Sequence, residues 1–193
     1  THKDTISMIK YLLCSQSWSQ DYDFIIYIDC DILINTNSPS IHDYIDYEDR
    51  IGIVDEYTQP SLEIRKLIQM KFGWEKTPTE YYKLADFDIE TNFMFNGGLF
   101  VMQPKIHKIF FESLYTKYVF HQINHPRKMH YEQACFGYEL IKQNKYKIID
   151  NKFNCIWLMY KVCNEKLQDV YNKNYFIHFA GKVDFDKIKD IKV

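Results

Sequence analysis

One stretch decides the fold of this chain: FIIYIDCD, residues 24–31. Five consecutive apolar residues without alternation predict a strand buried on both faces, which is typical of an α/β sheet. Ligands of open α/β sheets collect where strands end, and Asp29 and Asp31 follow the apolar run directly. Side chains two residues apart in an extended segment point the same way, so we expect both carboxylates to converge on one divalent cation or reacting group.

The size and composition of the chain bound its class. Its 193 residues suffice for one domain with a sizeable core. The hydrophobic share of 46% and the charged share of 26% exclude a disordered chain. A net charge of −2 argues against a nucleic-acid-binding protein, which usually carries a basic excess. No apolar run reaches about 18 residues, so we expect no transmembrane segment.

The five cysteines indicate a reducing environment. Their number is odd, and they form no Cys-x-x-Cys pair. We expect reduced, mostly buried thiols and a cytoplasmic protein, or a lumenal one if an N-terminal anchor precedes Thr1.

Strand and helix patterns alternate along the chain, which indicates the α/β class. After the strand at 24–28, further strands are expected at 32–34, 51–54, 93–95, 99–102, 147–150 and 175–180. Helices are expected from Asp4 with its apolar face at Ile6, Ile9, Leu12 and Leu13, from Ser38 as cap with Pro39 next, over 64–72, from Pro104, and over 131–143.

Asn96, Gly97 and Gly98 interrupt an apolar strand pattern. Glycines there weaken a strand unless the backbone must bend or approach something closely. A structural bulge or hairpin turn and a sugar-binding segment are equally good interpretations, because the Asn96 amide suits sugar hydroxyls.

Three later positions are candidates for binding or catalysis. Glu132 and Gln133 are expected near a helix start, where Glu132 has an ordinary capping role and the Gln133 amide could bond a sugar or reacting centre. His178 lies in an apolar strand pattern, where a histidine is more often a core residue than a ligand. Gly181 releases the chain, and Lys182 supplies a mobile cation that could meet phosphate.

Taken in order, these motifs resemble the nucleotide-sugar glycosyltransferases of GT-A fold, especially glycosyltransferase family 8, which includes glycogenin-like and lipopolysaccharide galactosyltransferase-like enzymes. The resemblance covers roughly residues 5–185: an apolar strand ending in D-x-D, an F-N-x-G segment at 95–98, an acid-Gln pair at 132–133 and an H-x-x-G segment at 178–181. It implies a GT-A-like α/β fold with a mixed, mostly parallel sheet flanked by helices. It also implies a single domain over 1–193 that is incomplete at its N-terminus and lacks base-binding strands, because only 28 residues precede Asp29.

The resemblance also implies roles for residues. Asp29, Asp31 and His178 would hold Mn²⁺ or Mg²⁺ against the diphosphate of a nucleotide-sugar donor, expected to be a UDP-sugar. Glu132 would bind the donor sugar, and Gln133 would lie beneath the anomeric carbon. Lys182 would steady the leaving diphosphate. The donor and acceptor would be lined by Asn96, Gly97, Gly98 and Gly181. A hexose would pass with retention to a hydroxyl of a glycan or protein, and a homodimer is one expected assembly.

Two alternatives remain open at this point. In a haloacid-dehalogenase-like phosphatase, Asp29 would be a covalent nucleophile and Asp31 a general acid/base, but Asp184 and Asp186 come too late to be its second acid pair. A catalytically inactive relative that only binds a sugar or partner is the other. The sequence departs from the family's pattern after Gly181, where the chain runs Lys182-Val183-Asp184-Phe185 and the family usually has Lys-Pro-Trp.

Overall fold

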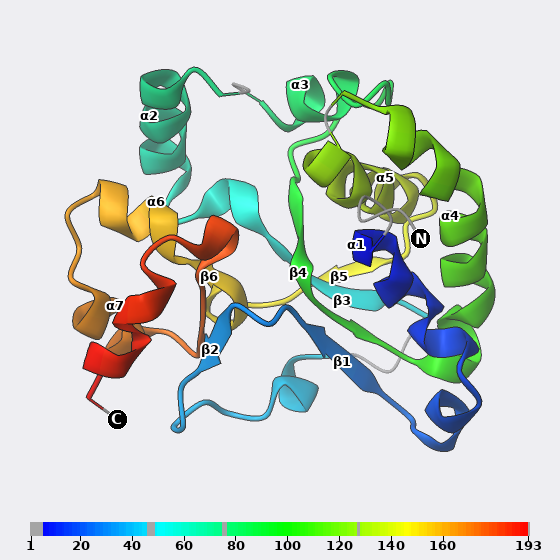
Figure 1. Ribbon diagram of the computed structural model, residues 1–193, viewed down its shortest axis with the longest axis horizontal. Helices are drawn as coiled ribbons and strands as arrows, with labels where there is room; N and C mark the ends of the chain where they lie inside the picture. The colour runs from blue at the N-terminus through cyan, green and yellow to red at the C-terminus, as the bar shows by residue number, and fades with distance from the viewer. Residues whose placement is uncertain (1–5, 46–48, 75–76, 127, 193) are drawn as a thin grey trace.

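The computed structural model describes residues 6–45, 49–74, 77–126 and 128–192, apart from the side chains of residues 123, 128–130 and 182. Two sheets share these residues, and helices flank both (Figure 1). The larger sheet has the strand order β1-β4-β3-β5, with β1 at Ile25–Ile28, β3 at Ile51–Asp55, β4 at Phe95–Met102 and β5 at Tyr146–Ile148. β1, β3 and β5 run in one direction and β4 against them, so the expected mixed α/β fold is confirmed.

The smaller sheet lies beside the larger one and is continuous with it along the chain. Its strand order is β2-β7-β6, with β2 at Ile32–Ile34, β6 at Cys155–Ile156 and β7 at Phe176–His178. β1 and β2 are separated only by residues 29–31, so the acidic motif is the link between the two sheets. The register pairs Ile32 with His178, which brings the end of β7 to this link.

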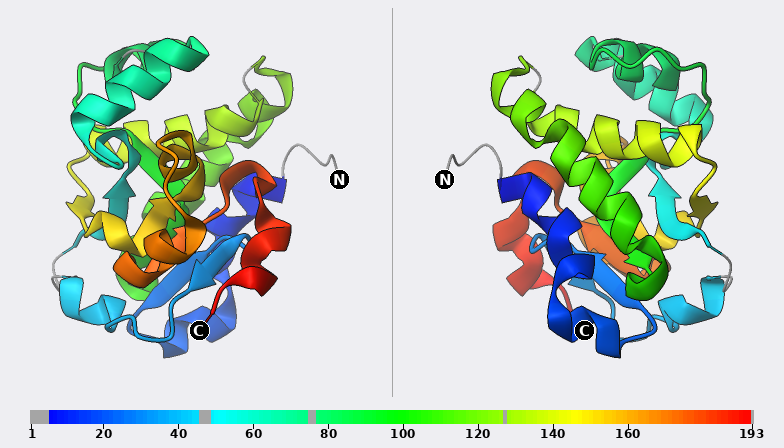
Figure 2. Two further views of the ribbon diagram at one scale, coloured as in Figure 1. Left: turned by 90° about the vertical axis from the view of Figure 1, so that its left-hand side faces the viewer. Right: turned by 90° about the vertical axis from the view of Figure 1, so that its right-hand side faces the viewer.

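The helices divide between the two sheets. α4 (Pro104–Asn124) and α5 (Lys128–Lys142) pack against one another, and α5 also contacts β4. The right-hand view of Figure 2 shows α4 crossing this side of the molecule beside the N-terminal helical segment. The other helices are α1 (Ile6–Ile9), α2 (Leu62–Phe72), α3 (Pro78–Lys83), α6 (Trp157–Val162) and α7 (Leu167–Lys173), together with 3-10 turns at Lys10–Ser15, Ser17–Asp21, Ile41–Tyr44, Glu56–Thr58, Asn151–Asn154, Ala180–Lys182 and Phe185–Asp190.

β1, the strand that precedes the two aspartates, is less buried than its sequence predicts. β1 is the edge strand of the larger sheet, and Ile26 is 43% exposed. The expectation that the apolar run is buried on both faces is therefore wrong. Only one long edge of β1 is paired, because among the described strands only β4 hydrogen-bonds to it.

The glycine segment at 96–98 forms neither a turn nor a hairpin. β4 runs unbroken from Phe95 to Met102, and every residue in it is buried. The expected pair of short strands is one strand, because both glycines are accommodated as close-approach positions inside the sheet. The register with β3 shifts at this segment, between the pairs Ile53–Phe100 and Asp55–Phe95. The extra residues lie in β4, so the glycine segment forms the bulge that was one of its expected interpretations.

The N-terminal helix buries a different face from the expected one. α1 ends after one turn and continues as a 3-10 helix, which repeats every three residues. Met8, Tyr11 and Cys14 follow that spacing and are fully buried, whereas Ile6 and Ile9 are more than half exposed. The expected cap Asp4 lies outside the described residues.

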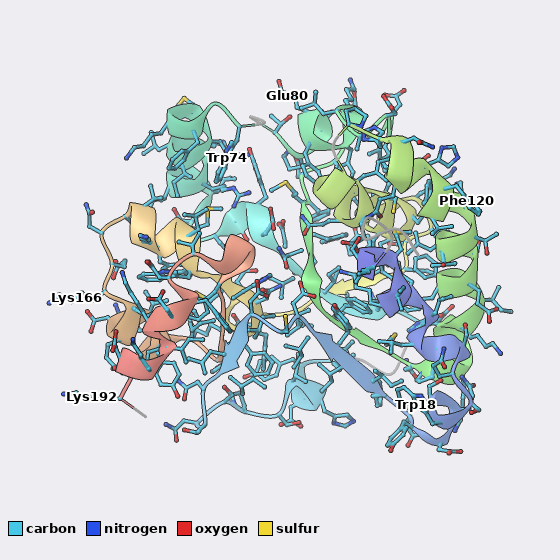
Figure 3. The ribbon with its side chains drawn as sticks, in the orientation of Figure 1. Trp18, Trp74, Glu80, Phe120, Lys166 and Lys192 are labelled. Atoms are coloured by element: carbon cyan, nitrogen blue, oxygen red, sulfur yellow. The ribbon has the colours of Figure 1, made fainter. Side chains whose placement is uncertain are left out.

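Smaller differences concern caps and aromatic residues. The short helix expected from Ser38 is a 3-10 turn that begins at Ile41, with Ser40 at its N-cap and no side-chain capping bond. Trp18 and Phe120 are exposed at the periphery, while Trp74 lies beside α2 (Figure 3). All five cysteines are free thiols, and Cys30 is the one exposed residue among them.

Candidate metal centre and active site

Asp29, Asp31 and His178 meet where the two sheets join. One ligand atom from each lies within 4.8 Å of the others. The Nε2 atom of His178 is 3.3 Å from Oδ1 of Asp31, and the His178 side chain is 5% exposed. Two carboxylate oxygens and one imidazole nitrogen form a donor set that suits a divalent cation. We refer to these three residues as the metal triad.

The two aspartates converge through a turn and not through an extended strand. The Ile32 N–H donates to the Asp29 carbonyl at 3.2 Å, which closes the turn between β1 and β2. The Asp29 N–H donates to the Gly98 carbonyl at 2.8 Å, and the Phe179 N–H donates to the Asp31 carbonyl at 2.9 Å. Backbone bonds to both sheets therefore fix the position of each aspartate.

Tyr27 supports the metal triad from β1. Its hydroxyl donates to Oδ1 of Asp29 at 2.5 Å. Burial raises the pKa of the Tyr27 phenol far above its usual range, and the neighbouring Asp29 carboxylate raises it further. Tyr27 therefore remains a protonated donor, and it orients one oxygen of Asp29.

Gly98 lets the metal triad form. A Cβ atom at this position would lie 2.4 Å from Cε1 of His178 and 3.0 Å from Oδ2 of Asp29. No side chain fits there without displacing a triad residue. This close approach explains the glycine inside a buried strand.

Gly97 borders a second group of polar residues, which includes Glu132 and Gln133. A Cβ atom here would lie 3.4 Å from Oε1 of Glu132 and 3.9 Å from Cγ of Gln133. The Gly97 N–H donates to Oε1 of Gln133 at 3.1 Å, and Nε2 of Gln133 donates to the Tyr81 hydroxyl at 3.3 Å. The glycine segment therefore has the metal triad at one residue and the Glu132–Gln133 pair at the next.

Glu132 is paired inside the protein. Nζ of Lys10 lies 2.9 Å from Oε1 of Glu132, and both side chains are 7% exposed. The same lysine donates to the Gly97 carbonyl at 2.8 Å, and the Tyr11 hydroxyl donates to Oε1 of Glu132. Burial raises the pKa of Tyr11, and the Glu132 charge raises it further. We call Lys10, Tyr11 and Glu132 the buried ion-pair group.

Glu132 and Gln133 lie in the second turn of α5, because that helix begins at Lys128 and not at residue 131. A role for Glu132 as a capping acid at the helix start is therefore excluded. Gly181 has a φ of 71°, which suits glycine, and nothing lies within 4 Å of its Cβ position. The side chain of Lys182 lies outside the described residues.

Several residues of the site escaped the sequence analysis. Lys10 lies in what reads as an ordinary amphipathic helix, and only its burial reveals its role. Asn154 places its Oδ1, an acceptor, 2.9 Å from Nδ1 of His178 and is fully buried. Arg65 and Glu56 form a buried pair at 3.1 Å. Asn154 lies 24 residues from His178 and 58 from Asn96, so no local pattern could have joined them.

The sequence matches the family model "Glycosyl transferase family 8" over residues 3–184. The chain belongs to glycosyl transferase family 8. The expected family and the expected enzyme class, a glycosyltransferase, are confirmed. Enzymes of family 8 generally use a divalent metal, and the metal triad is the candidate place for it.

Solved structures agree on the GT-A fold of this family 8 chain. One is a glycosyltransferase involved in glycosylation of the major capsid of PBCV-1, with a TM-score of 0.58 and 14% identity; the match covers 99% of this chain and 78% of that one. Another is the galactosyltransferase LgtC in complex with donor and acceptor sugar analogs, with a TM-score of 0.59 and 13% identity, covering 95% and 65%. The chain thus spans less than two thirds of the length of LgtC. A search of curated proteins found no match.

The family assignment argues against the phosphatase alternative. Asp184, which already comes too late to be the second acid of a phosphatase, pairs with Lys161 at 2.8 Å and Lys187 at 3.0 Å and accepts from the Trp157 indole. These partners, Lys161 first, hold the pKa of the Asp184 carboxyl well below its usual range. No helix among the described residues is long and apolar enough to cross a membrane.

Proposed function

We propose that this chain transfers a hexose from a nucleotide-diphosphate sugar, a UDP-sugar, to a hydroxyl acceptor, with Mn²⁺ and with retention of configuration. The observation that carries the proposal is the metal triad at the carboxyl end of β1, where two acids and an imidazole converge. An acid cluster of this kind concentrates a divalent cation, and the cation in turn attracts a pyrophosphate.

The residues present fit a divalent metal by their donor chemistry. Asp29 and Asp31 would supply oxygen ligands, and His178 would supply Nε2. The imidazole favours Mn²⁺ over Mg²⁺, because Mg²⁺ prefers an all-oxygen shell. When bound, such an ion supplies Lewis-acid stabilisation of the departing nucleoside diphosphate. No protein nucleophile is required for that contribution.

The chain's other residues would hold the donor sugar beside the metal triad. Asn96, Gly97 and Gly98 would line the donor sugar, because Gly98 lies against the metal triad and Gly97 lies against Glu132 and Gln133. Gln133 would present its amide beneath the anomeric carbon, since the Gly97 N–H orients its Oε1. Glu132 would bind the sugar through Oε2, because Oε1 already receives Lys10 and Tyr11. Gly181 and Lys182 would flank the leaving diphosphate.

The test is donor hydrolysis. The protein is incubated with a panel of UDP- and GDP-sugars with and without Mn²⁺, and released nucleoside diphosphate is measured. We expect release from a UDP-sugar only with the metal, and a loss of about 1000-fold in Asp31→Asn, equivalent to about 4 kcal/mol of barrier. Asp186→Asn, which changes an exposed aspartate outside the triad, is the matched control and should keep full activity.

Three outcomes would contradict the proposal. Phosphate release from p-nitrophenyl phosphate, lost in Asp29→Asn, would restore the phosphatase interpretation with Asp29 as nucleophile. Sugar binding without any release of nucleoside diphosphate would identify an inactive relative. Unchanged hydrolysis in Asp31→Asn would remove the metal triad from the reaction altogether.

A further inference from the structure

A network of buried, hydrogen-bonded side chains extends from His178 of the metal triad into the protein. His178 Nδ1 lies 2.9 Å from Oδ1 of Asn154, and Nδ2 of Asn154 lies 2.9 Å from Oδ1 of Asn96. Nδ2 of Asn96 lies 2.7 Å from Oε2 of Glu56, whose other oxygen is 3.1 Å from Nη2 of Arg65. The exposed fraction of each of these five residues is 9% or less.

Five separate elements supply these residues. Glu56 follows β3 directly, Arg65 lies in α2 and Asn96 lies in β4. Asn154 ends the 3-10 turn before β6, and His178 ends β7, whose register pairs it with Ile156. The network is therefore a product of the tertiary fold and joins both sheets to α2.

Two groups fix the direction of every hydrogen bond in this network, because each of them can only donate or only accept. A backbone N–H can only donate, and the Gly98 N–H is 2.9 Å from Oδ1 of Asn96. A carboxylate paired with a guanidinium can only accept, and Glu56 faces the other side of the Asn96 amide. Both groups independently place the Asn96 oxygen toward Gly98 and its nitrogen toward Glu56.

The orientation of Asn96 then dictates that of Asn154. An Asn96 oxygen facing Asn154 requires the Asn154 nitrogen as donor, so the Asn154 oxygen must face His178. An oxygen there accepts, and Nδ1 of His178 must carry the hydrogen. The neutral ring then has its lone pair on Nε2, the atom that lies 3.3 Å from Asp31 within the metal triad.

We propose that Asn154, Asn96, Glu56 and Arg65 form a positioning relay that holds His178 in its Nδ1–H tautomer and so keeps Nε2 available as a metal ligand. This proposal depends on the proposed function in one respect, namely that the metal triad binds a metal ion. Without the relay, the Asp31 carboxylate would favour a hydrogen on Nε2, and that tautomer cannot bind a cation there. Asn96 thereby serves the metal triad in addition to any contact with sugar.

The tautomer is measured first, in metal-free protein. Two-bond ¹⁵N–¹H correlation spectra at about pH 8.5, where an ordinary imidazole is neutral, distinguish Nδ1–H from Nε2–H. The His178 signals are assigned by their absence in His178→Gln. We expect the Nδ1–H pattern in the wild-type protein. An Nε2–H pattern there would overturn the relay directly, without any variant.

Variants of Asn154 then test the link to the metal. Asn154→Leu keeps the shape but removes the acceptor, and we expect the Nε2–H pattern together with Mn²⁺ binding weakened 10- to 100-fold, measured by electron paramagnetic resonance of free Mn²⁺. Asn154→Asp keeps an acceptor for His178, and its Mn²⁺ affinity should stay within about threefold of wild type. Asn151→Leu, on the same 3-10 turn and bonded to Thr58, is the matched control and should change neither readout.

The outcomes separate the relay from the proposed function. An Asn154→Leu protein that folds and keeps both the Nδ1–H pattern and wild-type Mn²⁺ affinity overturns the relay. If that variant does not fold, the wild-type spectrum and the Asn154→Asp affinity still decide. A wild-type protein with the Nδ1–H pattern that binds no Mn²⁺ supports the hydrogen-bond polarity and overturns the metal site.

Discussion

The two sides of the glycine segment on β4 differ in how their carboxylates are paired. Next to Gly97, the Glu132 carboxylate is buried and meets a lysine of the same chain at 2.9 Å. Next to Gly98, two carboxylates and an imidazole gather within 4.8 Å, and Asp29 and Asp31 are only half-buried. With two carboxylates and one imidazole, the metal triad has an excess of acidic groups. The buried ion-pair group balances its charge within the fold, whereas the metal triad holds two acidic groups close together without a lysine or arginine among its three residues.

The largest expected effect breaks the buried ion-pair group. Lys10→Met leaves the Glu132 carboxylate buried without its cation, and the free energy of unfolding should fall by about 3–5 kcal/mol. Chemical denaturation measures the change. The double variant Lys10→Met, Glu132→Gln should recover most of the loss, because it also removes the buried charge.

A matched control for that experiment lies two turns further along α5. Lys117 pairs with Glu139 at 2.6 Å, but the Lys117 side chain is 50% exposed. Lys117→Met should therefore lower the free energy of unfolding by less than about 1 kcal/mol. Equal losses in the two lysine variants would mean that burial does not distinguish the pairs, and the comparison would fail.

The two glycines give a paired prediction of intermediate size. Gly98→Ala places a Cβ atom 2.4 Å from the His178 ring, so it should destabilise the fold by about 3 kcal/mol and abolish Mn²⁺ binding. Gly97→Ala meets the flexible end of Lys10 at 3.2 Å and should lower stability by about 1 kcal/mol with Mn²⁺ binding retained. Thermal unfolding with and without Mn²⁺ measures both, and reversed ranks would contradict the assignment of the two sides.

The smallest expected effect has the opposite sign. Asn in place of Asp29 keeps an acceptor for Tyr27 but removes one of two neighbouring negative charges. The metal-free Asp29→Asn protein should therefore be more stable than wild type, by about 0.5–1 kcal/mol, in chemical denaturation at low ionic strength. A clear loss of stability would show that the metal triad, like the buried ion-pair group, is a structural element.

The sequence predicted the acids and their place but not the means of bringing them together. The apolar run and the D-x-D motif located the strand end at Asp29, and the order of four motifs indicated the family. The convergence itself depends on a turn and on the register of Ile32 with His178, which are long-range properties. Likewise, the reason for Gly98 is visible only once His178, 80 residues later, lies against it.

The misassigned elements share one physical cause. An apolar pattern reports how many side chains are buried but not which neighbour covers them. β1 lies at a sheet edge, so its apolar run is partly exposed, and the 3-10 helix after α1 changes the spacing of the buried residues to Met8, Tyr11 and Cys14. Lys10 could not be found for the same reason, since its partner Glu132 is far away in the sequence.

Calorimetric titration of Mn²⁺ into the wild-type protein, Asp31→Asn and Glu132→Gln tests the central claim most directly. The account predicts one Mn²⁺ per wild-type chain, no measurable binding to Asp31→Asn, and binding of wild-type strength to Glu132→Gln, which lies on the other side of the glycine segment. Equal Mn²⁺ binding by wild type and Asp31→Asn, or none by the wild type, would contradict it.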